Sequence, residues 1–507
     1  MKILSAKQIR EADQYTIEHE PVASIDLMER AATACFKWIV QHFDVINSFK
    51  VFCGTGNNGG DGLAIARMLH DSGYAVTTYI IRSGGNAAED FKTNETRLRD
   101  LKKSIVIDID SKKNFPEFSD GDIIIDAVFG TGLNKPAKDL TADVIKYIDN
   151  SEAKIISIDI PSGLFADQSS VDSANQIIKA AYTLSFQVYK LAFFFAENAE
   201  YVGDVIILPI GLNEKFISSC QSNYELLEEK HIHRILKKRK SFSHKGNYGH
   251  AAIVAGSLGK MGAAVLAAKA CLRTGAGLLT VHIPEIGYEI MQTSIPEAMC
   301  STPNFSCHSQ TISAPFVDLD KYSSIGIGPG IGTSEETANA LKQIIQDYKK
   351  PMVIDADAIN IISENKTWMD FIPAESILTP HPKEFERLVG KSNNHFERNK
   401  MQLEFSKRYN IFIILKGKYT CITCPDGMSY FNPTGNPGMA KGGSGDVLTG
   451  MITGLLTQGY SSKEACIAVV YLHGLAADIA VKETGEYSLL ATDLINSIGK
   501  AFLELGS

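Results

Sequence analysis

The glycine-rich stretch GTGNNGGDG, residues 54–62, places side chains capable of chemistry directly after a short apolar segment. Its glycines have G-x-G-x-x-G spacing, which lets a backbone approach the pyrophosphate of a dinucleotide, although ordinary tight turns share the pattern. Asn57, Asn58 and Asp61 stand where a phosphate would be expected to sit. Their oxygens indicate a polar substrate or a cation rather than a simple phosphate cradle.

Two further loops in the first half follow apolar segments. The loop GTGLNKP, 130–136, comes after a segment containing Asp126, and PSG, 161–163, comes directly after Asp159 and Ile160. In open α/β sheets, ligands bind outside the carboxyl ends of the strands, so these loops are expected to form one site. A usual NAD site would carry an acid where this sequence has Arg82, and no GK[ST] motif follows the glycines. An ordinary dinucleotide coenzyme site is therefore disfavoured.

Asn58, Asp126 and Ser162 each follow a different predicted strand. Their oxygens could converge on one hard cation, which prefers several oxygen ligands. Each residue alone is also common as a turn or cap residue, so the structural alternative stays open.

The strongest signal in the second half is NPTGNPGMAKGGSGDVLTG, 432–450. The glycine cluster GGSG precedes Asp446 and an apolar helical pattern, and free N–H groups at such a helix start form an anion hole. Asp446 is unsuited to binding phosphate but suited to act as a base beside a hydroxyl that exchanges a phosphoryl group. The alternative is that Asp446 is only a helix N-cap.

Three more loops support a phosphoryl-transfer site. LKGKYT, 415–420, ends a predicted strand with Lys416, which could bind a nucleotide phosphate or be an ordinary surface lysine. His381 lies between two prolines before Glu384, which could be only an acid favoured by the helix dipole, and the histidine itself could be structural. GIGPGIG, 326–332, could bring flexible backbone to a ligand or form a plain turn.

Short apolar runs alternate with helical patterns along the chain, which favours parallel sheets covered by helices on both faces. After a helical start (1 to about 45, broken at Pro21), the first series of strands is expected at 50–53, 75–82, 122–129, 153–160, 181–188 and 204–212. A polar connector, 213–243, precedes the second series, expected at 249–256, 277–284, 324–330, 351–358, 375–381 and 412–417. The sequence therefore predicts an α/β protein of two three-layer domains.

Composition narrows the class of protein. The chain has 507 residues and a net charge of −8, which favours two to four domains and argues against a nucleic-acid partner. The basic cluster HRILKKRK, 233–240, is interpreted as a solvated connector. No apolar run reaches the ~18 residues of a membrane helix, and the start is too polar for a signal peptide. The cysteines are scattered, and CITC (421–424) is interpreted as a structural strand segment rather than a metal or redox site. We therefore expect a cytoplasmic protein without a membrane partner.

The three loops of the first half, preceded by DLMERAA (26–32), resemble the epimerase domain that acts on hydrated NADH and NADPH. The resemblance covers residues 1–215 and implies a Rossmann-like fold that holds a damaged coenzyme as its substrate. It implies a potassium ion among Asn58, Asp126 and Ser162. The implied substrate contacts are Asn57, Asn58, Gly59, Gly60, Asp61, Gly130, Thr131, Gly132, Leu133, Asn134, Lys135, Pro136 and Asp159.

Residues 225–507 resemble the ribokinase-like superfamily and, more closely, the ADP- or ATP-dependent dehydratase that repairs the same hydrates. The motifs that carry the resemblance are HKGNYGHAAIVAGSLGKMG, IGPGIG, DADAIN, TPHPKEFERL, LKGKYT and NPGMAKGGSGDVLTG. It implies adenine-nucleotide contacts from Lys416, Gly417, Lys418, Tyr419, Thr420 and Gly445. It implies hydrate contacts from Ala263 or Ala264, Gly330, His381 and Asp446; Lys260-Met261 departs from the expected proline and leaves the alanine contact open.

The whole chain thus resembles the bifunctional NAD(P)H-hydrate repair enzymes, whose substrates are the hydrates NADHX and NADPHX. The resemblance implies that the first domain interconverts the R and S hydrates, with Asp159 and Lys135 as candidates for proton transfer. It implies that the second domain dehydrates the S hydrate through phosphorylation, with Asp446 as base and Mg²⁺ accompanying ADP or ATP. Potassium would hold the loops of the first domain.

Two alternatives remain at this stage. The second domain could be a kinase for a small alcohol, such as a sugar or vitamin precursor, with Asp446 still the base. The first domain would then be a nucleotide-binding module without catalysis. A homo-oligomer is expected in either case, because open α/β folds often assemble.

Overall fold

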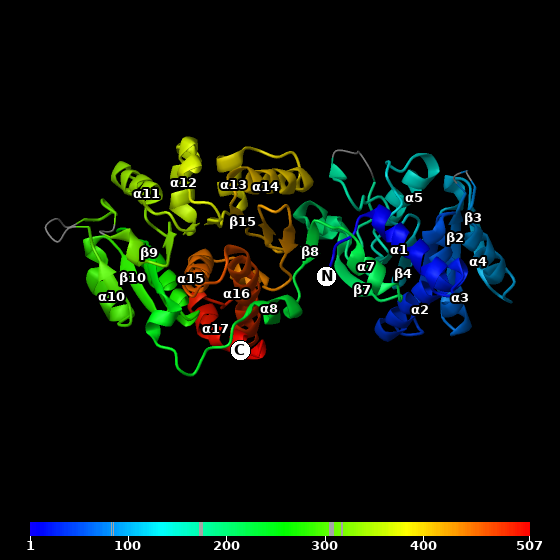
Figure 1. Ribbon diagram of the computed structural model, residues 1–507. Coiled ribbons are helices and arrows are strands. Elements are labelled where there is room, and N and C mark those ends of the chain that lie inside the picture. The colour runs from blue at the N-terminus through cyan, green and yellow to red at the C-terminus, as the bar shows by residue number, and fades with distance from the viewer. Residues whose placement is uncertain (83, 85, 172–175, 304–308, 316–317, 507) are drawn as a thin grey trace. The chain divides into compact units, whose positions relative to one another are not determined.

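The computed structural model describes residues 1–82, 84, 86–171, 176–303, 309–315 and 318–506 (Figure 1). The chain forms two compact units, which we call the N-terminal unit and the C-terminal unit. The N-terminal unit comprises Lys2–Ser222 and Asn394–Phe396, and the C-terminal unit comprises Met1, Asn223–Asn393 and Glu397–Ser507.

The N-terminal unit is built on a seven-stranded sheet of order β3-β2-β1-β4-β5-β6-β7, in which every pairing is parallel. The order reverses between β1 and β4, and such a switch point is where open α/β sheets bind ligands. Its strands are β1 (Ser48–Cys53), β2 (Ala75–Ile81), β3 (Ile105–Ile109), β4 (Asp122–Ala127), β5 (Lys154–Ile158), β6 (Tyr182–Phe186) and β7 (Asp204–Leu208).

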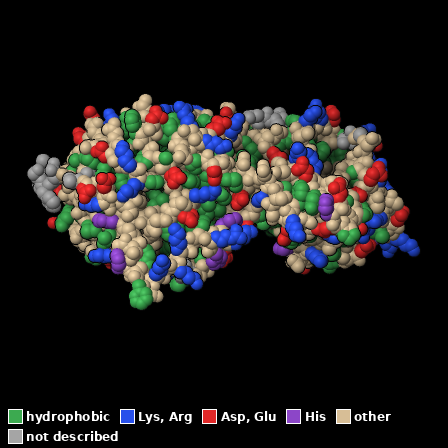
Figure 2. Space-filling model, in the orientation of Figure 1, with side chains coloured by type: hydrophobic (Ala, Val, Ile, Leu, Met, Phe, Trp, Pro, Cys, Tyr) green, Lys and Arg blue, Asp and Glu red, His purple; other side chains and the backbone are tan. Residues whose placement is uncertain are grey.

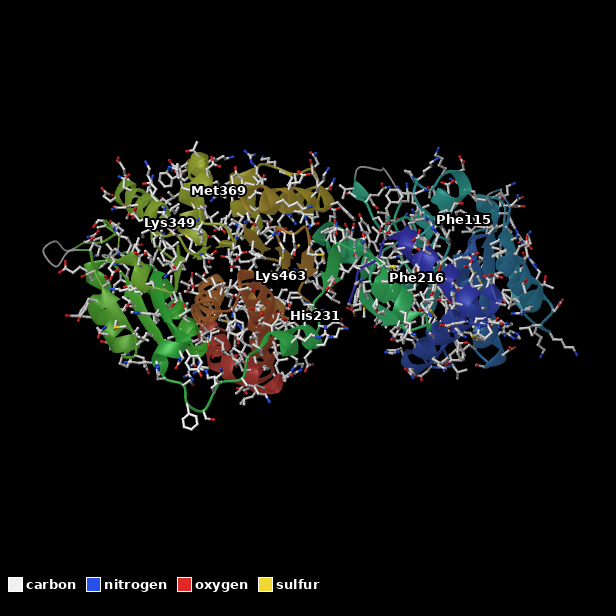
Figure 3. The ribbon with its side chains drawn as sticks, viewed as in Figure 1. Phe115, Phe216, His231, Lys349, Met369 and Lys463 are labelled. Carbon is white, nitrogen blue, oxygen red and sulfur yellow. The ribbon has the colours of Figure 1, made fainter. Side chains whose placement is uncertain are left out.

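Both faces of this sheet are covered by helices. Alternate residues of β1 divide between two cores, because successive side chains of a strand point to opposite faces: Val51 packs with one helical layer and Phe52 with the other. The first layer consists of α2 (Ser24–His42), α3 (Asn57–Asp71) and α4 (Glu89–Arg99), and the second contains α5 (Asp139–Asp149). On the α5 side, Phe115 (labelled in Figure 3) packs against Tyr147 with tilted rings, whose centroids are 4.8 Å apart. The amphipathic helix α1 (Ala6–His19) and the short α6 (Ala199–Val202) and α7 (Glu214–Ser219) complete the unit.

The C-terminal unit contains a ten-stranded sheet of order β11-β10-β9-β12-β13-β14-β15-β16-β17-β8. Its pairings are parallel except β15–β16 and β16–β17, which are antiparallel. The strands are β8 (Tyr224–Leu226), β9 (His250–Val254), β10 (Leu278–His282), β11 (Met299–Ser301), β12 (Ser324–Ile327), β13 (Met352–Ile354), β14 (Ile377–Leu378), β15 (Phe412–Leu415), β16 (Cys421–Thr423) and β17 (Ser429–Phe431).

Helices cover both faces of this sheet as well, so each unit has the three layers predicted from the sequence (Figure 1). One face carries α9 (Met261–Arg273), α10 (Tyr288–Ser294), α15 (Ser444–Thr457), α16 (Ser462–Thr484) and α17 (Ala491–Glu504). The other carries α11 (Glu335–Asp347), α12 (Ala356–Glu364), α13 (Pro382–Val389) and α14 (His395–Tyr409). Met369 is buried in this second layer (Figure 3).

The segment 213–243 is more structured than the polar connector predicted from the sequence. It contains α7, β8 and α8 (Glu229–Ile235), and β8 pairs in parallel with β17 at the edge of the C-terminal sheet. The prediction was wrong because β8 has only three residues, too few to show a hydrophobic period. The three-residue strands β11 and β17 escaped prediction for the same reason, and the five-residue β3 was also missed.

The distribution of surface charge and one long apolar helix are relevant to nucleic-acid and membrane partners. Acidic and basic side chains are interspersed over the visible face of each unit (Figure 2). Among the described residues, α16 is the one helix long and apolar enough to cross a membrane, and 67% of its apolar window is buried inside the protein. Cys421 and Cys424 are free, buried thiols, and burial raises the pKa of Cys424 to about 12.

The close contact of α9 and α15 generates a prediction about stability. A Cβ atom on Gly450 would lie 2.0 Å from the carbonyl oxygen of Ala267, so Gly450→Ala must push the helices apart. We expect it to lower the free energy of unfolding of the C-terminal unit by about 1–3 kcal/mol. Gly499→Ala is the matched control, because a Cβ there meets nothing within 4 Å and should stabilise α17 by up to about 1 kcal/mol. Urea unfolding monitored by circular dichroism measures both; equal effects would refute the packing argument.

Candidate functional sites

The N-terminal site lies at the switch point between β1 and β4. The loop after β1 leads into α3, which begins at Asn57, and the loop after β4 passes close beside it. Two glycines make this approach possible: a Cβ on Gly54 would lie 2.2 Å from the carbonyl oxygen of Val128, and one on Gly59 would lie 1.8 Å from that of Gly54. The glycines of the motif are therefore required by the packing of the loops on each other.

Asp126, at the end of β4, is fully buried and organises the floor of the site. Its Oδ1 accepts a hydrogen bond from the Ser162 hydroxyl at 2.5 Å, and its Oδ2 accepts one from the Ser162 backbone N–H at 2.8 Å and one from the Ser157 hydroxyl at 2.7 Å. Burial raises the pKa of Asp126, and these hydrogen bonds oppose the rise. The sequence-predicted pair Asp126 and Ser162 is thus in direct contact.

Asn58 lies above this floor on the first turn of α3. Its side chain is 92% buried, yet neither its amide nitrogen nor its amide oxygen has a hydrogen-bond partner. A buried amide without partners is costly, so its unmet oxygen and nitrogen indicate a place for a ligand. A Cβ on Gly130 would lie 3.3 Å from the Asn58 Cβ and 3.1 Å from Asp159 Oδ2, so the three predicted residues converge.

Asp159 follows β5 in a left-handed backbone conformation, with φ of 69°. Such a conformation is unfavourable for an aspartate and is often found at functional sites. Its Oδ2 accepts a hydrogen bond from the Thr131 N–H at 3.0 Å, and its Oδ1 lies 2.5 Å from Nζ of Lys190. The Lys190 side chain is completely buried and also donates to the Ser185 hydroxyl. Lys190 therefore pairs with the Asp159 carboxylate and fixes its position in the site.

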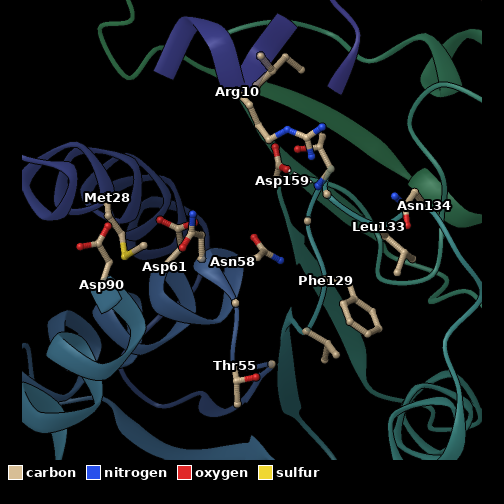
Figure 4. Close-up of a pocket in the computed structure, with 18 of the residues that line it drawn as sticks. Arg10, Met28, Thr55, Asn58, Asp61, Asp90, Phe129, Leu133, Asn134 and Asp159 are labelled. Atoms are coloured by element: carbon tan, nitrogen blue, oxygen red, sulfur yellow. Dashed lines mark hydrogen bonds between the residues drawn. The ribbon is translucent and has the colours of Figure 1, made fainter. Parts of the chain in front are cut away.

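Asn58 and Asp159 border a cavity of about 1120 Å³, whereas Asp126, Ser162 and Lys190 are buried outside its lining (Figure 4). The lining includes Asn57, Asn58, Asp61, Asp159 and every residue of the loop Gly130–Pro136. Gly59 and Gly60 are buried behind the first turn of α3, where Gly60 meets Met28. Lys135 lies in the exposed part of its loop, so its role in proton transfer stays a prediction.

Sequence reasoning missed two charged groups of this site, Lys190 and Asp13. Lys190 follows β6, and its position after a strand was the available signal. Asp13 lies on α1 and lines the cavity beside Arg10, far in sequence from the glycine loops. Burial, then the charge of Asp159, raises the pKa of Asp13 to about 7, while Lys190 opposes the rise. Arg82, found where an NAD site would place an acid, pairs with Glu95 and Asp108.

The C-terminal site is centred on the start of α15. Gly443 is the N-cap, with φ of 98°, so Asp446 stands in the first turn and is not the helix cap. Burial, then the charges of Asp355 and Asp357, raises the pKa of Asp446 to about 6, and Lys416 opposes the rise. A partly buried carboxylate that titrates near neutrality, at a helix start rich in free N–H groups, suits a general base beside an anion hole.

Asp355 joins this site from the end of β13 and is 1% exposed. Its Oδ1 accepts from Nζ of Lys416 at 3.0 Å, and its Oδ2 accepts from the Thr449 hydroxyl at 2.8 Å. A Cβ on Gly445 would lie 3.4 Å from Nζ of Lys416, so the two predicted nucleotide contacts lie together. Lys416 is therefore partly buried and paired with Asp355 beside the start of α15, and its contact with a nucleotide stays a prediction. The rest of its loop, Gly417–Thr420, is closed by a hydrogen bond from the Thr420 hydroxyl to the Gly417 carbonyl at 3.0 Å.

The loop GIGPGIG and the start of α9 face each other. Gly328, Gly330 and Gly332 all have positive φ, so the loop requires its glycines. A Cβ on Gly330 would lie 3.1 Å from the Cβ of Ala263, and Ala263 is partly exposed whereas Ala264 is fully buried. Of the two alanines left open by the sequence, Ala263 is the one accessible to a ligand.

His381 caps helix α13, a structural role in addition to the substrate contact predicted for it. Its Nδ1 accepts hydrogen bonds from the N–H groups of Lys383 and Glu384 at 3.0 and 3.2 Å, which caps α13, and Glu384 caps in return. Because Nδ1 accepts, a neutral ring carries its proton on Nε2. The ring is 45% exposed, and Nε2 lies 3.4 Å from the Glu384 carboxylate. Its contact with substrate stays a prediction.

His473 was not predicted. It is buried on α16, and its Nε2 lies 3.0 Å from the carbonyl oxygen of Ser444 in the glycine loop. Burial lowers its pKa to about 4, so the ring is neutral and donates that hydrogen bond. Because it stands in the middle of an apolar helical pattern, nothing in the sequence indicated that it belongs to the site.

Two α/β units, each with polar side chains gathered at the carboxyl ends of its strands, define a two-domain protein with a candidate catalytic site in each domain. Comparison with known families agrees with this division. Residues 251–500 match the family model described as NAD(P)H-hydrate dehydratase, and residues 24–192 match the one described as YjeF-related protein N-terminus.

Curated relatives match over nearly the whole chain. A bifunctional NAD(P)H-hydrate repair enzyme of Coxiella burnetii is 34% identical over 96% of this chain and 96% of its own. One of Moorella thermoacetica is 32% identical over 98% and 96%. The chain belongs to the family of bifunctional NAD(P)H-hydrate repair enzymes. A solved ADP/ATP-dependent NAD(P)H-hydrate dehydratase of Bacillus subtilis, co-crystallised with ATP and Mg²⁺, is 32% identical and covers 55% of this chain and 98% of its own, with a TM-score of 0.49.

The buried pair of Lys190 and Asp159 generates a prediction. Lys190→Met leaves a buried carboxylate without its partner, and we expect it to lower the free energy of unfolding of the N-terminal unit by about 3–5 kcal/mol. Lys179→Met is the matched control, because the pair of Lys179 with Glu200 is exposed to solvent and should contribute little to stability. Thermal unfolding of both variants measures the difference. Equal, small losses would show that the buried pair does not hold the site.

Proposed function

We propose that residues 1–215 interconvert the R and S hydrates of NADH and NADPH, and that residues 225–507 dehydrate the S hydrate with ADP or ATP. Membership of the repair-enzyme family supports both activities. The arrangement of Asp446, Lys416 and Asp355 at the start of α15 is the observation that most strongly supports the second. In each domain the proposed residues lie at the carboxyl ends of parallel strands, where α/β proteins bind substrates.

The hydrate carries a hydroxyl on C6, and hydroxide is a poor leaving group. In the proposed reaction Asp446 takes the hydroxyl proton while the oxygen attacks the terminal phosphorus of the nucleotide, whose bridging P–O bond breaks. The C6–O bond then breaks with loss of phosphate, and a proton leaves C5 to form the double bond of NAD(P)H. Amide groups of the GGSG loop would stabilise charge on the transferred phosphoryl group. His473 would hold that loop through the Ser444 carbonyl.

The residues present fit a magnesium ion that arrives with the nucleotide. Mg²⁺ is commonly bound by one or two carboxylates together with substrate phosphates, and Asp355 and Asp357 stand beside the proposed phosphate site. Among the described residues there is no group of three acidic, histidine or cysteine side chains that would hold a metal alone. Magnesium would neutralise charge on the phosphates.

The proposed base generates a prediction for the dehydratase. Because Asp446 acts ionised, kcat/KM for dehydration should rise with pH through about 6 and then stay level. Asp446→Asn should lower kcat by about 10²–10⁴-fold. Recovery of the NADH absorbance band after addition of nucleotide measures both. Asp426→Asn, on an exposed hairpin paired with Lys463, should leave the rate unchanged. Full activity in Asp446→Asn would remove Asp446 from the reaction.

The side-chain oxygens of Asn58, Asp126 and Ser162 suit a potassium ion, because a hard cation prefers oxygen ligands. Asn58 lines the N-terminal cavity and its amide has no protein partner, whereas Asp126 and Ser162 are fully buried outside the cavity lining. Potassium would satisfy the amide oxygen and tie the loops after β1, β4 and β5 together. Its part would be structural, and proton transfer would remain with the protein side chains.

Potassium binding can be tested without an activity assay. The melting temperature of the N-terminal unit should be higher in KCl than in tetramethylammonium chloride at equal ionic strength, because a bound ion stabilises the folded state. Asn58→Ala should abolish that difference. Asn47→Ala, at a partly exposed bend before β1, should keep it. A wild-type protein indifferent to potassium would refute the site.

The alternative of a small-alcohol kinase with an N-terminal binding module is not favoured, because the relatives match both domains together. The homo-oligomer and the cytoplasmic location expected from the sequence stay predictions. So do the individual contacts of Gly330, His381 and the loop Gly417–Thr420 with substrate or nucleotide.

A further inference from the structure

Helix α1 contributes an acidic side chain to the N-terminal cavity that none of the glycine motifs includes. Its inner face buries Ile9, Ala12 and Thr16, and Ser5 caps its start with Gln8 in a reciprocal pair of hydrogen bonds. Asp13, adjacent to the buried Ala12, is partly buried and lines the cavity. Burying a carboxyl group costs free energy of desolvation, so the presence of Asp13 on the cavity side of α1 indicates a function in the cavity.

Charged side chains from several elements surround Asp13. Asp159 from the end of β5 and Asp61 from α3 repel its negative charge, and the buried Lys190 attracts it. Arg10 lies one turn earlier on α1 and lines the mouth of the same cavity. The Nζ atom of Lys190 lies 2.5 Å from Oδ1 of Asp159. Burial, then the charge of Asp159, raises the pKa of Asp13 to about 7, so a large share of Asp13 is protonated at neutral pH.

The cavity therefore holds two carboxyl groups whose pKa values burial raises, Asp13 and Asp61, and a third, Asp159, whose Oδ1 lies 2.5 Å from the ammonium group of Lys190. Carboxyl groups in such different surroundings can divide the roles of acid and base between them. The substrate needs both: its C6 carries a hydroxyl and is bonded to the ring nitrogen N1, so the centre can lose and regain water.

We infer that Asp13 is the general acid of the epimerase site and that Asp159 is its base, an assignment that rests on the epimerase function proposed above. Asp13 gives its proton to the C6 hydroxyl, the C6–O bond breaks, water leaves, and the N1 lone pair forms an N1=C6 double bond. Water then attacks C6 from the other face while Asp159 takes its proton, and the N1=C6 pair returns to nitrogen. The proton on Asp159 returns to Asp13 through solvent. One water leaves and one enters, so atoms and charge balance.

The route makes an isotopic prediction for the wild-type chain. In H₂¹⁸O, without nucleotide, each molecule of purified R hydrate converted to S should gain one ¹⁸O at C6. Chromatographic separation of the epimers followed by mass spectrometry measures this. Opening of the ring at the N1–C6 bond would invert C6 with its original oxygen retained, and that result would overturn the inference. A wild-type chain that does not accelerate the interconversion at all would instead refute the epimerase function.

Substitution of Asp13 tests the assignment of the acid. The wild-type kcat for epimerisation should fall as pH rises through about 7, and Asp13→Asn should lose about 10²–10⁴-fold at pH 6 together with that dependence. Glu11→Gln, exposed on the same helix, is the control and should behave as wild type. A loss confined to Asp61→Asn, or a full rate in Asp13→Asn, would overturn the inference.

Stability separates this role from a purely structural one. The folded-state pKa of Asp13 lies above its unfolded value, so the folded protein binds the extra proton and loses stability as pH rises toward about 7. Asp13→Asn removes that loss, and its melting temperature relative to wild type should be higher at pH 8 than at pH 5. A variant destabilised equally at both pH values would show that Asp13 only supports the fold.

Discussion

The close approach of loops at the carboxyl ends of parallel strands is the constraint on which both sites depend. In the N-terminal unit, Gly54 and Gly59 let the loop after β1 fold onto itself and against Val128 of the loop after β4. In the C-terminal unit, a Cβ on Gly328 would lie 1.8 Å from the carbonyl oxygen of Asp355, so this glycine lets the loop after β12 pass beside the acid that holds Lys416. A bulkier residue at any of these positions would separate the groups that the chemistry needs together.

Electrostatics then differentiates the acids that this packing brings together. The Asp159 carboxylate pairs with the buried ammonium group of Lys190, whereas burial and like charges raise the pKa values of Asp13 and Asp446. These arrangements reduce stability at neutral pH, as expected where a protein keeps charged groups for catalysis. In each domain, a carboxyl group with a raised pKa lies near a lysine that pairs with a second aspartate. The lysine is Lys190 beside Asp13 in one domain and Lys416 beside Asp446 in the other.

Much of the fold and of the two candidate sites could be predicted from the sequence, and the features that sequence reasoning missed have physical causes. Apolar runs followed by glycine loops predicted the α/β class, and several residues directly after strands lie together: Asp126 with Ser162, Asn58 with Gly130, and Lys416 with Gly445. Lys190 and Asp13 were not found because their roles come from tertiary contact with Asp159, which no local pattern records. The cap made by His381 depends on the orientation of its ring, and the three-residue strand β8 becomes a strand only through its pairing with β17.

The central claim is that one chain holds an epimerase that supplies its own dehydratase. It is tested most directly with a mixture of R and S hydrates of known composition, given to the chain with nucleotide and Mg²⁺ while the NADH absorbance is followed. The account predicts that the wild type recovers both hydrates at the enzymatic rate. With Asp159→Ala, recovery should pause when the S hydrate is exhausted and continue only at the spontaneous rate of epimerisation. Complete, single-phase recovery by Asp159→Ala at the wild-type rate would contradict the account.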